Sequence, residues 1–236
     1  MSLQGVFPLF IEGVLSEERL RAYRRYPGDT DVDAVLRYLW NTELSASFYA
    51  PLQHLEVALR NAMHEALTVK YGTEFWFDTP ELLHAFQVEQ VDKARRKIGL
   101  PVGYGAGKII AELEFGFWTA LLHKKYAPSL VPVLMKDAFR CVEKGCRTRE
   151  FLSEALNKAR MLRNRIFHHE PIWYFRDLPD QHMRILQLIL WVSPSLFRIA
   201  LLTDRFSCVY KAGTHPFHVG VLGMVLEHGD GLASGN

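Results

Sequence analysis

The sequence has few cysteines, little net charge and no long uninterrupted apolar run. Cys141, Cys146 and Cys208 form no paired framework, which predicts free thiols in a reducing compartment and leaves a zinc site without a second cysteine pair. A formal net charge of +2 neither requires nor excludes a nucleic-acid partner. The most apolar stretch, 185–202, is interrupted by glutamine, proline and arginine. We therefore expect no membrane span and, with no signal-peptide pattern at the start, a cytoplasmic protein.

Strand-like alternation bounded by hairpin turns is also missing, and apolar residues recur instead at helical spacing. The pattern predicts an all-α protein of seven to nine helices. We expect an N-terminal segment at 1–14, one helical domain at 15–206 and an irregular tail at 207–236. The expected helices are 16–26, 30–49, 51–72, 79–99, 108–126, 129–140, 148–169, 179–192 and 193–202.

Local signals set several of these helix boundaries. Ser16 is the expected N-cap of the first helix, and Thr30 with Asp33 has the spacing of a capping box. Gly72 and Gly99 follow the last periodic residues of their helices, as glycine does at helix ends. These signals predict where helices begin and end but not how they pack.

The helix at 148–169 carries an unusual polar cluster, MLRNRIFHHEP, beside its apolar stripe. Arg163 lies four residues after Ala159, on or next to that stripe. A guanidinium buried there without a partner would cost roughly several kcal/mol, so a partner is expected. Asn164 and His168 are four residues apart, within reach of a side-chain hydrogen bond.

Two adjacent histidines, His168 and His169, fall where Pro171 ends this helix, and we expect both in its last turn. The negative end of the helix dipole favours a protonated imidazole, while the neighbouring arginines oppose it. Opposed effects of this kind leave a histidine able to titrate near neutrality, as a general acid or base requires.

A second polar line, formed by Glu56, Arg60 and His64, has a spacing of four residues on the helix at 51–72. Glu56 borders the apolar stripe of that helix. We therefore predict that Glu56 is the counter-ion of Arg163 if the two helices pack together.

Arg163-Asn164-x-x-x-His168 resembles the Arg-x-x-x-x-His signature of HEPN domains, helical modules that include many metal-independent endoribonucleases. Three blocks resemble the Abi-like, abortive-infection branch of these proteins in the same order: HLEVALRNAMHEAL, AELEFGFWTALL and MLRNRIFHHEPI. The resemblance covers roughly 15–206. The arginine-to-histidine spacing alone is a weak signal, and the ordered blocks are the stronger one.

The resemblance implies an RNA phosphodiester substrate, with His168 as general acid or base, Arg163 steadying the phosphate and Asn164 orienting the pair. It further implies a homodimer, because such sites form where two copies meet, and no cofactor or metal. An antitoxin or other regulatory partner stays open. The alternative is a catalytically inert helical module that binds RNA or protein, whose polar cluster is structural.

Glu170 marks a departure from the resemblance. HEPN toxins controlled by a nucleotidyltransferase often have tyrosine two residues after the histidine, so that form of control is not expected here. His169 also fits an arginine-to-histidine count one residue longer, but we expect it to be partly buried. The supporting residues of the predicted site are Glu56, Arg60, His64, Arg165, His169 and Glu170.

Three further sequence patterns bear on function. Lys158 and Arg160 lie beside the predicted site and could contact an RNA backbone. GYGAGK at 103–108 lacks the glycine and the Ser/Thr that a phosphate-binding loop needs. Metal binding by His168, His169 and Glu170 with His64 is disfavoured, because adjacent histidines point to different sides of a helix.

Overall fold

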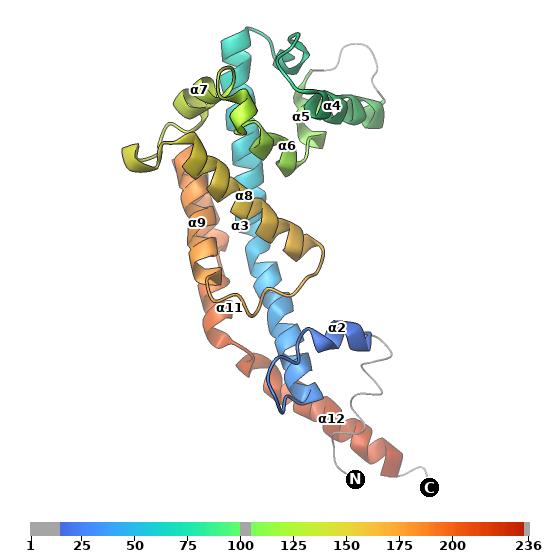
Figure 1. The fold of residues 1–236 in the computed structure, drawn as a ribbon. Helices are drawn as coiled ribbons and strands as arrows, with labels where there is room; N and C mark the ends of the chain where they lie inside the picture. Colours follow the sequence, from blue (N-terminus) through green and yellow to red (C-terminus); the bar gives the residue numbers. More distant parts are fainter. Residues whose placement is uncertain (1–14, 100–104, 234–236) are drawn as a thin grey trace. The chain divides into compact units, whose positions relative to one another are not determined.

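The computed structural model describes residues 15–99 and 105–233, with side chains as far as 225 (Figure 1). These residues contain helices and no strands, which confirms the all-α prediction. The predicted N-terminal segment at 1–14 lies outside the described residues. Within the described part, no helix is both long enough and apolar enough to cross a membrane.

The chain divides into two compact units, where the sequence predicted one helical domain with a tail. The first comprises Met1–Tyr49, Arg165–Pro179 and Asp204–Asn236, and the second comprises Ala50–Asn164 and Asp180–Thr203. Each unit is therefore built from segments that are far apart in the sequence.

The first unit contains α2 (Glu17–Arg21), the first part of α3 (Asp31–Tyr71), α11 (Phe206–Ala212) and α12 (His218–Ala233). The prediction of an irregular tail is wrong for the described residues, which form α11, a short 3-10 helix at His215–Phe217, and α12. Apolar side chains explain the order: Val221 and Val225 are buried in one cluster with Leu20, Val35 and Leu36.

The second unit contains the rest of α3 together with α4 (Ala85–Ile98), α5 (Gly107–Glu112), α6 (Phe115–Ala120), α7 (Val131–Val133), most of α8 (Arg149–Phe167), α9 (Leu178–Val192) and α10 (Pro194–Thr203). Aromatic residues contribute to its core: Trp76 and Trp118 are fully buried, and their ring centroids lie 6.3 Å apart. The predicted apolar stripe of α8 is confirmed, and all of its members are buried: Leu152, Ala155, Leu156, Ala159, Leu162 and Ile166.

Several helix boundaries follow the predicted signals. The Ser16 hydroxyl accepts from the Arg19 backbone N–H at 3.4 Å. Thr30 and Asp33 form a reciprocal capping box: the Thr30 N–H donates to Asp33 Oδ2 at 2.9 Å, and the Asp33 N–H to Thr30 Oγ1 at 3.2 Å. Gly99 ends α4 with a φ of 60°. The predicted starts of α2 and α3 and the end of α4 are confirmed.

Other boundaries were predicted wrongly. The helices expected at 30–49 and 51–72 are one helix, α3, with Pro51 inside it. Pro51 removes one backbone hydrogen bond, and buried Phe48, Leu52 and Leu55 on both sides favour continuing the helix.

Two more expected helices are shorter or broken. α4 begins at Ala85 rather than at 79–80, because Glu81 adopts a φ of 61° that no α-helix accommodates. The helix expected at 108–126 breaks at Leu113, whose backbone is extended. This break lets Leu113, Phe115 and Phe117 all reach the core, which one straight helix would not allow.

Candidate functional site

The end of α8 is a Schellman motif in which histidine occupies the position usually taken by glycine. The Glu170 N–H donates to the Arg165 carbonyl at 2.8 Å, and the His169 N–H donates to the Ile166 carbonyl at 3.0 Å. His169 has a φ of 57°, in the left-handed region. α8 therefore ends at Phe167, and the two histidines follow it rather than lying in its last turn as predicted.

His168, His169 and Glu170 are all exposed. The prediction that His169 is partly buried is therefore wrong, and the reason is the cap: its left-handed backbone turns the chain away from the apolar stripe of α8. The exposure of His168 meets a condition of acid–base catalysis, since the imidazole must reach its substrate.

Arg165 fixes the geometry of this cap. Its guanidinium lies 3.3 Å from the Glu170 carboxylate and donates to the Pro171 carbonyl at 3.4 Å and to the Tyr174 hydroxyl at 3.2 Å. The same group lies over the Phe175 ring at 5.1 Å. Arg165 thus supports the site by holding the segment after α8, and its contacts explain that role fully.

The second unit holds Arg163 and Asn164. The predicted pairing of Arg163 with Glu56 is confirmed, with 3.7 Å between Nη2 and Oε2. The side chains are 30% and 27% exposed, so the guanidinium is not deeply buried as its position on the stripe suggested. A pair of this length and exposure contributes at most about 1 kcal/mol. Asn164 is half-buried.

The two other polar residues of α3 have different surroundings. The Trp76 indole N–H donates to His64 Nδ1 at 3.0 Å, and burial lowers the pKa of His64, partly opposed by Glu74. His64 is therefore a structural acceptor for a buried tryptophan. Arg60 is half-buried and has no ion-pair partner in the part of the chain that the structure describes.

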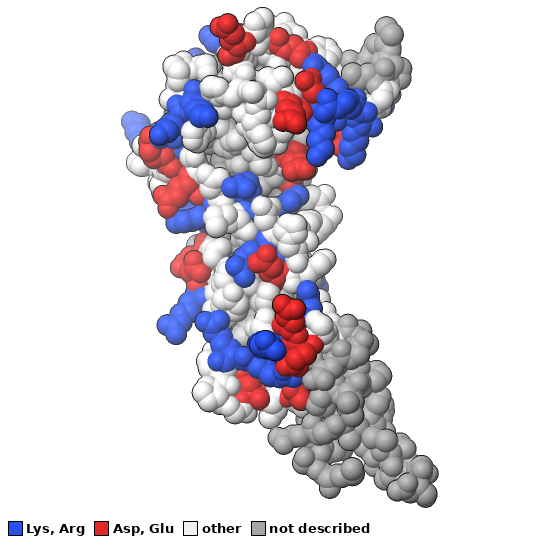
Figure 2. Space-filling model, turned by 45° about the vertical axis from the view of Figure 1, so that its right-hand side comes forward, with Lys and Arg blue, Asp and Glu red and all other residues white. Residues whose placement is uncertain are grey.

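Of the two predicted RNA-contacting residues, Lys158 pairs with Glu154 at 2.8 Å on an exposed face. Arg160 lines a cavity of about 580 Å³ in the second unit, together with Lys125, His84 and His123. Lysines and arginines also gather over the last turn of α4 (Figure 2). Ion pairs with acidic residues already engage two of those α4 side chains.

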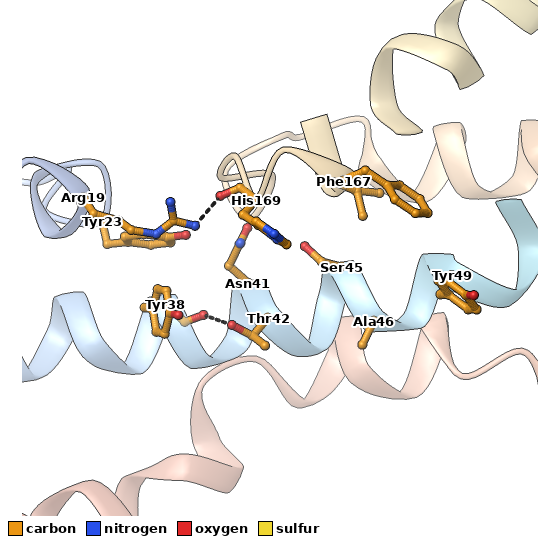
Figure 3. Close-up of a pocket in the computed structure, with 11 residues that line it drawn as sticks. Arg19, Tyr23, Tyr38, Asn41, Thr42, Ser45, Ala46, Tyr49, Phe167 and His169 are labelled. Carbon is orange, nitrogen blue, oxygen red and sulfur yellow. Dashed lines mark hydrogen bonds between the residues drawn. The ribbon is translucent and has the colours of Figure 1, made fainter. Parts of the chain in front are cut away.

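Two cavities of the first unit open beside the α8 cap. One, of about 300 Å³, is lined by His168, His169, Arg19 and Tyr23. The other, of about 560 Å³, shares the last three of these residues and extends along α3 to Tyr49 (Figure 3). The Arg19 guanidinium donates to the His169 carbonyl at 2.7 Å, and this bond ties α2 to the cap.

A separate network holds the segment between α2 and α3, which carries Tyr23. The Arg37 guanidinium donates to both carboxylate oxygens of Asp29, at 2.5 and 2.8 Å, and to the Tyr23 carbonyl at 2.8 Å. These hydrogen bonds, with two from backbone N–H groups, hold the pKa of Asp29 well below its usual range. The side of the cavity formed by Tyr23 is therefore fixed by charged groups.

Sequence reasoning missed Arg19, Tyr23 and Asn41, although they line the larger cavity. Asn41 offered one signal, a polar residue inside an apolar helical stretch. Its side chain is 5% exposed. Arg19 and Tyr23 offered none, because the helix expected at 16–26 has the pattern of an ordinary surface helix.

Comparisons with protein-family models, with curated proteins and with solved structures gave no match. The Abi-like resemblance therefore stays a prediction carried by three sequence blocks. Among the described residues, no three His, Cys, Asp or Glu side chains come together in a way that could hold a metal ion.

Proposed function

We propose that this chain is a metal-independent endoribonuclease, working in the cytoplasm in phage defence or growth arrest. His168 is its general acid or base, and Arg163 and Asn164 complete the site in a homodimer. The observation that carries the proposal is His168 itself, which is exposed on a hydrogen-bonded cap and lines a cavity with Arg19.

The chemistry suits these residue types. The 2′-hydroxyl of the RNA loses its proton to a base and attacks the adjacent phosphorus, the bond to the 5′-oxygen breaks, and a proton passes to that leaving oxygen. The products are a 2′,3′-cyclic phosphate and a 5′-hydroxyl. Histidine can serve either proton transfer, and a guanidinium stabilises the charge that develops on the phosphate oxygens.

The test is cleavage of RNA by the full chain in chelator, with melting temperatures measured in parallel. We expect the wild type to leave 2′,3′-cyclic ends and His168→Ala to lose activity by about 100-fold or more at an unchanged melting temperature. His215→Ala is the matched control, because it removes an exposed imidazole of the same unit that lines neither cavity, and it should retain cleavage. Normal activity in His168→Ala contradicts the proposal.

The second candidate is an inert RNA- or protein-binding module, favoured by the structural contacts of Arg165 and by the Glu56–Arg163 pair. It predicts no cleavage by the wild type. It also predicts that Arg163→Ala affects stability without affecting any reaction.

A further inference from the structure

Asn41 presents a donor of fixed orientation to the 560 Å³ cavity beside the α8 cap. Its Oδ1 accepts from the backbone N–H groups of Ile172 and Trp173, at 2.7 and 3.1 Å. These two bonds decide which end of the amide is oxygen and which is nitrogen. The NH₂ group donates to no described residue, although the side chain is 95% buried and lines the cavity. An unpaired donor that lines a cavity favours a ligand with an acceptor at that position.

Tyr23 is a second buried group without a partner at the same cavity. Its side chain is 0% exposed, and its hydroxyl makes no hydrogen bond among the described residues. Burial raises the pKa of Tyr23 to about 12, so the phenol stays protonated. Arg19, at the same end of the cavity (Figure 3), adds a guanidinium that only donates.

The far end of the cavity is aromatic. Tyr49 and Phe167 are 57% and 44% exposed, and their ring centroids lie 6.2 Å apart. Figure 3 shows them at the opposite end from Arg19, with Asn41, Ser45 and His169 between. Exposed aromatic faces next to oriented polar donors suit a planar heterocycle, since base–aromatic stacking contributes roughly 1–3 kcal/mol.

We propose that this cavity is a nucleobase-binding subsite that prefers a keto base, uracil or guanine, over adenine. The base stacks on Tyr49 and Phe167, and a keto oxygen accepts from the Asn41 NH₂. The adjoining phosphate lies toward Arg19. A volume of about 560 Å³ is within the usual range for a small-molecule site.

Adenine is disfavoured because it has no keto oxygen. Its exocyclic amino group, which takes the place of the keto oxygen of guanine, would face the Asn41 NH₂ and the Arg19 guanidinium, and neither of these can accept a hydrogen bond. The discrimination therefore comes from the amide and the guanidinium, not from the shape of the cavity.

The base has two sources, an RNA strand or a free nucleotide. With RNA, which rests on the proposed function, the base seated here belongs to a nucleotide next to the cleaved bond. The reason is that the two cavities share Arg19, Tyr23 and His169, and His168 lines the smaller one. With a free nucleotide, the same contacts bind an effector.

The experiment is a calorimetric titration of the full chain with UMP, GMP and AMP, which measures the dissociation constant of each nucleotide. We expect UMP or GMP to bind about tenfold more tightly than AMP. Tyr49→Ala removes the stacking face from an exposed position and should weaken binding about tenfold. Tyr26→Ala is the matched control: Tyr26 is 58% exposed, belongs to the same unit and does not line the cavity.

Asn41→Asp tests the donor, because a carboxylate can still accept from the two backbone N–H groups but has no NH₂ to offer. We expect the preference for keto bases to disappear while the fold is retained. His168→Ala should bind UMP as the wild type does, so failure of the ribonuclease proposal leaves this readout intact. Displacement of a bound RNA oligonucleotide by UMP supports the RNA source, and UMP binding without displacement supports the effector.

Equal affinity for all three nucleotides, or no binding at millimolar concentration, overturns the subsite. An unchanged UMP affinity in Tyr49→Ala does so too. If Tyr26→Ala weakens UMP binding as much as Tyr49→Ala does, the loss of affinity is a general effect of changing the surface, and this result counts against the subsite.

Discussion

Replacing His169 by glycine should stabilise the protein, although it removes a side chain beside the candidate site. The residue has a φ of 57°, a left-handed conformation that costs an L-residue roughly 1–2 kcal/mol and glycine nothing. Glycine loses about 0.5–1 kcal/mol through the greater freedom of its unfolded chain. With both costs near the middle of their ranges, the difference is a gain of about 0.5–1 kcal/mol. The bonds of the cap survive, since they use only the backbone of His169.

Urea and thermal unfolding measure this gain, and the thermal midpoint should rise by about 1–4 °C for a chain of this size. The control makes the opposite change, from glycine to a residue with a Cβ at a left-handed position. Gly72 follows α3 with a φ of 71°, and an added Cβ there meets no atom within 4 Å. Gly72→Ala should therefore lose about what His169→Gly gains, because backbone strain alone separates the two residues.

A lower midpoint in His169→Gly would refute this reasoning, because it would mean that the imidazole makes stabilising contacts larger than the backbone strain. His169→Ala separates the two effects, since alanine keeps the Cβ and the strain but has no imidazole. We expect it to melt within about 1 °C of the wild type.

Three further outcomes follow from the contacts. Asn41→Ala leaves two buried N–H groups without an acceptor and should cost about 2–4 kcal/mol in urea unfolding. The pKa of His64 is lowered by burial from its ordinary 6.5, so the unfolded chain binds more protons and stability falls as pH drops below that value; His64→Gln, which keeps an acceptor for Trp76, should flatten this dependence between pH 7.5 and 5.5. Glu56→Gln should cost less than about 1 kcal/mol, so a larger loss would show that the Arg163 pair is effectively buried.

The residues that the sequence identified best were those whose signals are local. The capping box of Thr30 and Asp33 needs only a spacing of three, and the apolar stripe of α8 only a period of 3.6. The partnership of Glu56 and Arg163 was predictable because each borders the apolar stripe of its own helix. In all three cases the structure depends on residues a few positions apart, or on two faces that must both be buried.

The wrong predictions arose where tertiary packing overrode a local sequence signal. Pro51 predicts a helix end, but buried residues on both sides keep α3 continuous. The glycine- and histidine-rich tail lacks a clear period, yet Val221 and Val225 find apolar partners near residue 20 and at 35–36. No local pattern contains that information, because the partners are nearly 200 residues away in the sequence.

The same distinction applies to the candidate site, of which one part was predictable from local sequence and the other was not. His168 was found through a motif that spans the end of α8 and its cap, whereas the cavity beside it needs α2, α3 and the α8 cap together. His169 takes part in both the cap and the cavity. Its backbone closes the cap and accepts from Arg19, and its imidazole points toward the Asn41–Ser45 stretch of α3 (Figure 3). Glycine would build the same cap with less strain. A histidine at this position is therefore better explained by what its side chain does in the cavity than by the stability of the fold.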